Sequence, residues 1–205
     1  WSSCSPDFGE QGVLDRFGQI EPVVFIVPDG YWYNGKAIEV GDKIAAVAAK
    51  LVTVRKILIV DLDVHQGDGT ADIVGEERRV FTFSMHGDRN YPTRKIASDL
   101  DIALPDGTGD AAYLERLGGV LPELTAKARW DIVFYNAGVD VHAEDRLGRL
   151  SLSDEGLRAR DDMVIRHFRA LGIPVCGVIG GGYSTDVAAL AARHAILFEV
   201  ASDYA

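Results

Sequence analysis

The sequence predicts an α/β protein with a mostly parallel sheet, and three features of its pattern support that fold class. Short continuous apolar runs alternate along the chain with longer segments in which apolar residues recur at helical spacing. Repeated strand–helix units of this kind give parallel strands with helices on both faces of the sheet. Polar residues follow several of the apolar runs directly, and in such folds ligands bind at the carboxyl ends of the strands.

The expected strands are short apolar runs of the kind that are buried on both sides. They are Lys56–Asp61, Arg79–Met85, Asp131–Tyr135 and Val175–Ile179. A further run, Pro22–Val27, can also form a strand, and the aromatic-rich segment PDGYWYNGK after it is expected to be a loop.

The expected helices have apolar residues in register along one face. They are Gly41–Val54, Asp110–Lys127, Ser153–Leu171 and Asp186–His194. In the second of these, the residues in register are Tyr113, Leu117, Val120 and Leu124. Ser153 can cap the third helix, and Gly172 is placed to end it.

The composition is that of a globular protein of about one domain, with 205 residues, 47% of them hydrophobic and 25% charged. The net charge of −10 argues against nucleic acid as a partner and favours cationic partners. No apolar run approaches the roughly 20 residues that span a bilayer, so we expect no membrane partner.

The first ten residues, WSSCSPDFGE, contain neither a basic segment nor an apolar core, so no signal peptide is expected. They also lack an initiator Met, which predicts a processed chain or a fragment. Cys4 and Cys176 form neither a disulfide framework nor a metal-binding spacing. We therefore expect a reducing compartment and a cytoplasmic location.

The strongest candidate for chemistry is the segment DLDVHQGDGT, which begins at the end of the strand KILIV. Side chains alternate along extended backbone, so Asp61, Asp63 and His65 are expected to point to the same side. Burying two carboxylates there is costly unless a cation or hydrogen bonds compensate. Carboxylate plus imidazole suits Zn²⁺, Fe²⁺ or Mn²⁺ better than Ca²⁺ or Mg²⁺. The alternative is a polar turn with solvated acids and a surface histidine.

A second candidate is Asp140, which follows the strand DIVFY in the segment NAGVDVH. Together with Asp63 and His65 it would give three ligands and an open position for water, the pattern of a catalytic metal site. His142 is a candidate fourth contact, and the alternative for it is a solvated loop residue. Taken alone, an aspartate after a strand is usually a turn or cap residue.

The third candidate is the segment GGGYS after the last predicted strand. Glycines let the backbone turn sharply and approach a ligand closely. Tyr183 can offer its phenolic hydroxyl to a developing oxyanion. The alternative is a flexible turn with a packed tyrosine, whereas a phosphate-binding loop is disfavoured because its lysine is absent.

Four segments together closely resemble the histone deacetylase and acetylpolyamine amidohydrolase family, and most of all its small bacterial and class IV-like members: DLDVHQGDGT, FSMHG, YNAGVDVHAEDRLGRLSLSDEGL and GGGYS. The resemblance runs from about residue 42 to about residue 200. It implies an arginase-like, three-layer α/β fold and hydrolysis of an acetyl amide on acetyl-lysine, an acetylpolyamine or a similar amine. The chain would be a single domain over residues 1–205, with 41–205 as the family-like core and 1–40 as an atypical segment.

The resemblance also implies roles for individual residues. Asp63, His65 and Asp140 match the ligands of the catalytic ion, Zn²⁺ or, as an alternative, Fe²⁺. Tyr183 matches the residue that stabilises the transition state, and Gly181 and Gly182 belong to the substrate pocket. Asp61 stands behind the ligands, and it lies with Ser84 and Met85 where relatives bind a structural K⁺ or Na⁺.

The sequence departs from the family before its first metal motif. Relatives carry a GGxHHA-type loop there, whose paired histidines act as general base and general acid. The five histidines of this chain are His65, His86, His142, His167 and His194, so none precedes residue 65. At the matching place the chain reads Val27 to Tyr33 (VPDGYWY), where Asp29 is a weak substitute base and the aromatic residues are expected to pack or line a pocket.

Several functions therefore remain open at this point. The first is a zinc-dependent deacetylase, and the second is a metal-binding but catalytically impaired member of the same family. General acid–base catalysis typically supplies about 10²–10⁴-fold in rate, which is the expected cost of losing the histidine pair. More distant alternatives are a Mg²⁺-dependent, haloacid-dehalogenase-like phosphatase and a two-manganese ureohydrolase. Because the family's N-terminal residues are missing, we also expect a homo-oligomer or a rearranged N-terminus.

Overall fold

The computed structural model describes residues 10–17, 19, 30–33, 36–39 and 56–204. Contacts within the chain divide it into two compact units, residues 1–55 and 56–205. The single domain expected over residues 1–205 stays a prediction. The expected helix Gly41–Val54, the expected strand Pro22–Val27 and Asp29 lie outside the described residues.

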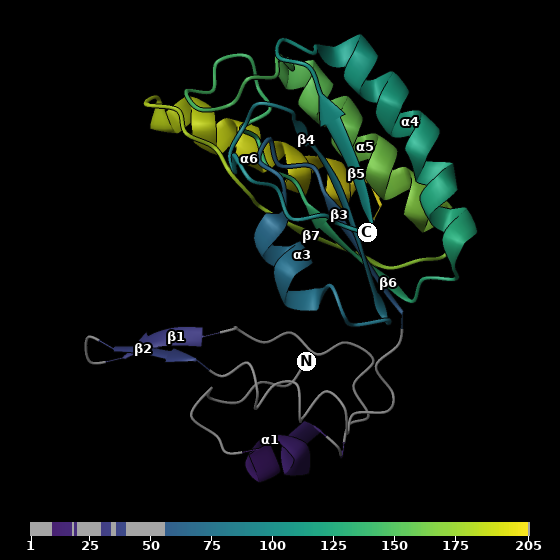
Figure 1. Cartoon of the computed structure of the whole chain (residues 1–205). Helices are drawn as coiled ribbons and strands as arrows, with labels where there is room; N and C mark the ends of the chain where they lie inside the picture. The colour runs from purple at the N-terminus through teal and green to yellow at the C-terminus, as the bar shows by residue number, and fades with distance from the viewer. Residues whose placement is uncertain (1–9, 18, 20–29, 34–35, 40–55, 205) are drawn as a thin grey trace. The chain divides into compact units, whose positions relative to one another are not determined.

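In the first unit, the described residues form one helix and one β-hairpin ladder (Figure 1). Helix α1 covers Glu10–Phe17, and strand β1, Gly30–Tyr33, pairs antiparallel with β2, Lys36–Glu39. The expectation of a loop over this aromatic segment was wrong. Tyrosine and tryptophan favour strands, and an Asn-Gly pair between two short runs is a strong hairpin signal.

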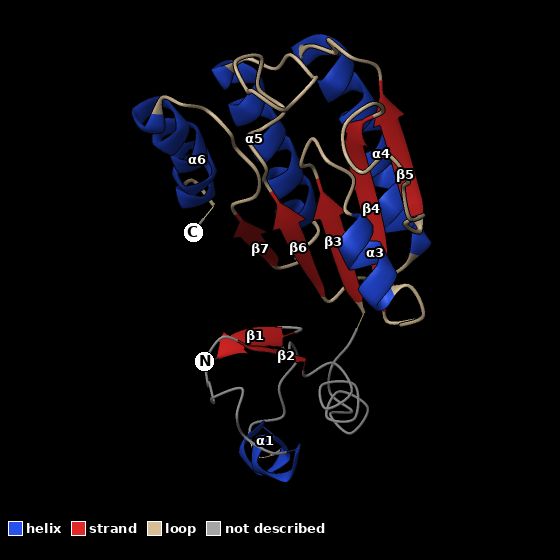
Figure 2. Ribbon diagram, turned by 60° about the vertical axis from the view of Figure 1, so that its left-hand side comes forward, coloured by secondary structure: helices blue, strands red, loops and turns tan. Residues whose placement is uncertain are grey.

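In the second unit, the described strands form one parallel sheet in the order β5-β4-β3-β6-β7 (Figure 2). Their bounds are β3 Ile57–Asp61, β4 Val80–Gly87, β5 Leu100–Leu104, β6 Ile132–Asn136 and β7 Val175–Val178. The four runs expected as strands in this unit are confirmed. Strand β5 was not predicted, because Asp101 interrupts its short apolar run.

The helices of this unit lie on both sides of the sheet, as expected for an α/β fold. Helices α4 and α5 cover one face and α3 lies on the other (Figures 1 and 2). The bounds are α3 Asp68–Val74, α4 Asp110–Lys127, α5 Asp154–Ala170 and α6 Val187–Ser202. Helix α3 was not predicted, because Gly67 and Gly69 at its start are typical of a turn. Helix α6 runs well beyond the expected end at His194.

The predicted core and capping residues of the helices are confirmed. Tyr113, Leu117, Val120 and Leu124 of α4 are all buried against the sheet. The Ser153 hydroxyl accepts a 3.0 Å hydrogen bond from the Gly156 N–H and so caps α5. Gly172, at a φ of +70°, ends the same helix, because that left-handed conformation favours glycine.

The strand order places β3 and β6 at the point where the chain reverses direction across the sheet. From β3 the chain moves outward through β4 to β5, and it then returns past β3 to β6 and β7. Helices α3 and α4 accordingly lie on opposite faces, as right-handed crossovers require. In open parallel sheets a crevice forms at such a switch point, beside the carboxyl ends of the strands. Residues directly after β3 and β6 therefore occupy the expected position of a binding site.

Candidate metal centre

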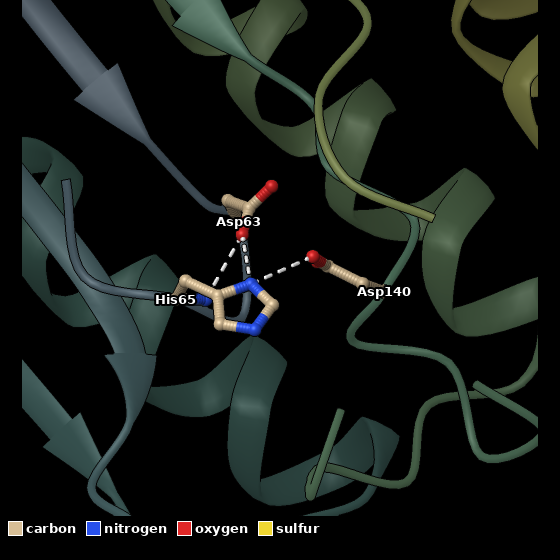
Figure 3. A group of neighbouring side chains, drawn as sticks. All are labelled: Asp63, His65 and Asp140. Atoms are coloured by element: carbon tan, nitrogen blue, oxygen red, sulfur yellow. Dashed lines mark hydrogen bonds and ion pairs between the residues drawn. The ribbon is translucent and has the colours of Figure 1, made fainter. Parts of the chain in front are cut away.

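Three side chains that can bind a metal converge at this switch point. Asp63 and His65 follow β3, Asp140 follows β6, and one ligand atom from each lies within 4.8 Å of the others. The His65 Nδ1 atom is 3.0 Å from Asp63 Oδ1 and 3.1 Å from Asp140 Oδ2 (Figure 3). Both aspartates are buried, and Asp140 is fully inaccessible to solvent. Two carboxylates and an imidazole at this spacing suit Zn²⁺ or Fe²⁺.

Burial and the hydrogen bonds among the three groups shift their pKa values in opposite directions. Hydrogen bonds to Asp140 and Asp63 raise the pKa of His65 to about 10. Burial raises the pKa of Asp140, against the hydrogen bond from His65. Burial acts on Asp63 in the same sense, but hydrogen bonds from His65 and from the Gly181 N–H outweigh it, so the pKa of Asp63 is lowered. A protonated imidazole thus stands where a metal cation would balance the two carboxylates.

Two glycines allow the backbone to reach the carboxylates. A Cβ atom at Gly181 would clash with Asp140 Oδ2, and one at Gly138 would clash with Asp63 Oδ2. The Gly181 N–H donates a 2.6 Å hydrogen bond to that same Asp63 oxygen. Only glycine fits so close to the ligand atoms, and this cradle supports the interpretation of the cluster as a metal centre.

Gly182 has different surroundings. A side chain there would meet Leu190, Val139 and His194, so this glycine packs against α6 and the loop after β6. Its assignment to the substrate pocket, together with that of Gly181, stays a prediction.

Asp61 lies apart from the group of three, as the family resemblance implies. One of its carboxylate oxygens, Oδ1, accepts hydrogen bonds of 3.0 Å from the Asp63 N–H and 2.9 Å from the Asn136 side chain. Burial raises the pKa of Asp61 to about 7. Ser84 is its direct neighbour in the β3–β4 register, and Met85 is fully buried in the core. The monovalent-cation roles of Asp61, Ser84 and Met85 stay predictions.

Tyr183 stands beside the cluster with its ring edge-on to that of His65, at 5.8 Å between ring centroids. The side chain is 42% exposed. Burial and then the negative charges of Asp140 and Asp63 raise the pKa of Tyr183, so its hydroxyl stays protonated at neutral pH. It is therefore available as a hydrogen-bond donor next to the metal ligands.

Asp145 is a residue that sequence reasoning missed. Its Oδ2 accepts a 2.7 Å hydrogen bond from the Tyr183 N–H, and its Oδ1 accepts from the Leu147 and Gly148 N–H groups. The carboxylate thus joins the loop after β6 to the loop that carries Tyr183. A signal was present, because Asp145 lies inside the long segment AGVDVHAEDRLGRLSLS that carries the resemblance.

The remaining histidines lie outside the group of three described above. His142 is buried with its Nε2 atom 3.2 Å from Asp154, so it is neither the expected fourth contact nor a solvated loop residue. His86 contacts the Ser84 hydroxyl, while His167 belongs to α5 and His194 to α6. None of these four histidines of the described residues belongs to the group of ligand atoms.

Residues 41–198 match the histone deacetylase domain. The chain belongs to the histone deacetylase family. An uncharacterised protein of Picosynechococcus is 47% identical over 162 residues, which cover 77% of this chain and 54% of that protein. The crystal structure of the acetylpolyamine aminohydrolase of Burkholderia pseudomallei has a TM-score of 0.62 and 26% identity, and the match covers 77% of this chain and 48% of that one. The chain thus spans about half the length of these relatives. Family membership removes the phosphatase alternative, and the α/β, arginase-like fold expected from the sequence is confirmed.

A further match is of a different kind. Fifty-one residues, 25% of the chain, are 74% identical to the acetoacetyl-coenzyme A synthetase of Rhizobium meliloti, of which they cover 8%. This match covers too little of the synthetase to indicate a shared activity.

No helix in the described part of the chain is both long and apolar enough to cross a bilayer.

Proposed function

We propose that the chain binds Zn²⁺ between Asp63, His65 and Asp140 and hydrolyses the amide bond of an acetylated amine. The observation that carries the proposal is the convergence of these three ligand atoms within 4.8 Å, at the end of the sheet where such folds bind ligands. Family membership supports the deacetylase activity, and the ligand set supports zinc over Mg²⁺. Asp61 and Ser84, which are neighbours in the β3–β4 register, would contribute with Met85 to a K⁺ or Na⁺ site.

The bound ion would polarise the acetyl carbonyl and acidify a water molecule. Tyr183 would donate its hydroxyl hydrogen bond to the oxyanion that develops on the same carbonyl. Because the pKa of Tyr183 is raised, the donor proton is present at neutral pH. A donor of this kind is worth about 3–4 kcal/mol to the transition state.

The substrate class follows from charge and from the rim of the site. The chain's net charge of −10 attracts substrates that carry further amines or lysines. Tyr91 and Leu147, 72% and 52% exposed, lie on the loops after β4 and β6, and Asn90 joins these loops by donating to the Leu147 carbonyl. Leu147 is linked to Tyr183 through Asp145, so we propose these exposed side chains as an apolar contact for the methylene chain of an acetyl-lysine peptide or an acetylpolyamine.

A second candidate function is that of a metal-binding homologue with impaired catalysis. The sequence has no histidine before residue 65, and the described histidines other than His65 lie outside the ligand group. The loss of a general base and acid costs about 10²–10⁴-fold in rate. The two candidates share the metal centre and differ in turnover.

One experiment separates them. The purified chain is loaded with Zn²⁺, its metal content is measured, and hydrolysis of a fluorogenic acetyl-lysine peptide and of acetylspermidine is followed. We expect one zinc per chain and slow turnover, which Tyr183→Phe lowers by about 10²–10³-fold with unchanged zinc content.

The possible results lead to different conclusions. Zinc without turnover, but with tight binding of a hydroxamate, supports the impaired homologue. A chain that binds no zinc contradicts both candidates. Turnover that survives Tyr183→Phe unchanged removes the tyrosine from the mechanism.

A further inference from the structure

The largest fully buried side chain of the described residues is charged. Arg160 of α5 has no solvent exposure, and its partner Asp161 is only 2% exposed. The Arg160 Nε atom donates a 2.9 Å hydrogen bond to Asp161 Oδ1. Buried ion pairs are often no more stabilising than apolar residues of the same volume. The ion pair alone therefore does not explain why Arg160 is buried, and its other contacts indicate its role.

The free end of the guanidinium bridges the two loops that carry the metal ligands. Arg160 Nη1 donates to the Gly138 carbonyl at 2.6 Å and lies 3.4 Å from the Leu62 carbonyl. Leu62 directly precedes Asp63, and Gly138 stands two residues before Asp140. One nitrogen atom of α5 thus contacts the backbone beside both ligands.

The guanidinium is itself held in place from β6. The Tyr135 hydroxyl donates a 2.5 Å hydrogen bond to the same Asp161 oxygen that Arg160 binds, and the Tyr135 ring centroid is 6.0 Å from the guanidinium carbon. Tyr135 and Asp161 thereby fix the direction in which Arg160 points. The network extends from β6 through α5 to the two loops, away from the solvent.

Other contacts join the ligand loops without Arg160, and two of them use backbone N–H groups. The Leu62 N–H donates to the Asn136 carbonyl at 3.1 Å, and the Val64 N–H donates to Asp140 Oδ1 at 2.8 Å. The loops therefore stay together when Arg160 is lost, but the Leu62 and Gly138 carbonyls lose their contact with the guanidinium. We therefore expect the loss of Arg160 to change the relative positions of the ligands, and so the metal affinity, more than the stability of the fold.

We propose that Arg160 is a positioning residue of the metal centre, whose guanidinium sets the separation of the two loops so that Asp63 and Asp140 can bind one ion. This inference rests on the proposed metal binding and extends it to a residue that touches neither the ion nor the substrate. Supporting residues of metal ligands typically contribute 10–100-fold to metal affinity.

The test compares variants of the full chain by three measurements: zinc affinity in competition with a chromophoric chelator, the absorption spectrum of the Co²⁺-loaded protein, and the metal-free melting temperature. The double variant Arg160→Met/Asp161→Leu removes both charges, so that neither is left buried without a partner. Arg160→Lys keeps the charge but cannot bind Asp161 and a carbonyl in the same planar geometry. Arg193→Met is the matched control, since Arg193 is a second buried arginine that pairs with Asp154 and Glu144 instead.

We expect zinc affinity about 10–100-fold weaker in the double variant, with an altered cobalt spectrum. Its melting temperature should fall no further than that of Arg193→Met, although the Tyr135 hydroxyl and the Gly138 carbonyl lose their partners. The zinc affinity of Arg160→Lys should fall between those of the double variant and the wild type. The control should melt lower and bind zinc within about twofold of the wild type. Tyr135→Phe, which removes one hydroxyl, gives a milder variant of the same network should the double variant not fold.

The positioning role would be overturned if the double variant had wild-type zinc affinity and an unchanged cobalt spectrum. If the double variant does not fold, the same result in Arg160→Lys and Tyr135→Phe would overturn it. Either result would leave the proposed function intact. A loss of affinity in Arg193→Met equal to that in the Arg160 variants would do the same, since general destabilisation would then explain it. Failure of the wild type itself to bind zinc overturns the proposed function and, with it, this role.

Discussion

Residues 56–204 and the first 55 residues differ in the candidate functional groups that they carry. The later residues contain the parallel sheet, the three converging ligand groups and Tyr183. The earlier residues cover the place where relatives are expected to carry the histidine pair, and the chain has no histidine there. The histone deacetylase match begins at residue 41, so most of the earlier residues lie outside it.

The difference separates the candidate metal ligands from the place where the resemblance puts the histidine pair. The three ligand groups follow two adjacent strands of one sheet. If the metal binds there as proposed, its binding would not need the N-terminal residues. We therefore expect metal affinity to depend on the three ligands and the residues that support them within residues 56–204, and not on residues 1–40.

The largest effect is expected from Asp140→Asn. The substitution removes one of two buried negative charges that face the cation, although the amide oxygen can still accept from the Val64 N–H. Zinc affinity should fall by more than about 100-fold, beyond the loss that supporting residues cause. Competition titration with a chelator measures it, and Asp72→Asn on the exposed surface of α3 is the control. Zinc affinity that is unchanged in Asp140→Asn would place the metal elsewhere.

The next effect is the pH dependence of zinc binding. Without metal the pKa of His65 is about 10, so at neutral pH a proton occupies the nitrogen that the ion needs. Each zinc ion must displace that proton, and affinity should fall as the pH falls, by about tenfold per unit. From pH 8 to pH 6 the expected loss from this proton alone is about 100-fold, and protonation of Asp140, whose pKa burial raises to about 6, adds to the loss near pH 6.

Chelator competition at several pH values gives this slope directly. Calorimetry in two buffers of different ionisation enthalpy counts the protons released. An affinity that is independent of pH would mean that the metal does not use His65.

A smaller effect is expected from Asp145→Asn. The change keeps Oδ1 for the Leu147 and Gly148 N–H groups and replaces the oxygen that accepts from the Tyr183 N–H. One lost hydrogen bond of about 0.5–1.5 kcal/mol corresponds to a turnover about three- to tenfold lower. Zinc affinity should not change, which separates this variant from the ligand variants. Equal losses in Asp145→Asn and in the exposed control Asp186→Asn would contradict the role of Asp145.

The smallest effect is expected from deleting residues 1–40, which lie outside the matched domain. Zinc affinity should stay within about twofold, because all three ligands follow later strands. A large loss of affinity would contradict the separation of metal binding from the N-terminal residues. Activity measured on the same protein then reports whether those residues contribute anything in place of the histidine pair.

Much of the fold followed from the sequence, because its strands and helices have strong periodic patterns. Continuous runs such as KILIVD predicted the central strands, and the apolar face of Asp110–Lys127 predicted α4 with its bounds. Strand β5 was missed, since Asp101 breaks its pattern, and α3 was missed, since its GDGT start favours a turn. The hairpin Gly30–Glu39 was missed although Asn34-Gly35 signals it.

In the candidate site, the proposed metal ligands could be predicted from the sequence, but the residues that hold them in place could not. The rule for strand ends predicts that Asp63, His65 and Asp140 lie close together. The alternation argument was incomplete, because residues 63–65 form bends and Asp61 does not join the group. The supporting contacts depend on helix packing, which no local pattern contains. Arg160 lies 98 residues from Leu62 along the chain, yet it approaches that residue's carbonyl. Its position within an amphipathic helix gave no sign that the guanidinium would be buried.

The close approach of Gly138 and Gly181 to the carboxylates has a consequence for how this protein tolerates variation. In a saturation library selected for zinc retention, these two codons should accept no replacement, not even alanine, because a single methyl group would occupy the oxygen positions. Gly119, where a methyl group meets nothing within 4 Å, lies inside α4, and alanine there should raise stability by about 1 kcal/mol. The pattern of permitted alanines along the sequence would thus mark the glycines that lie against the metal ligands.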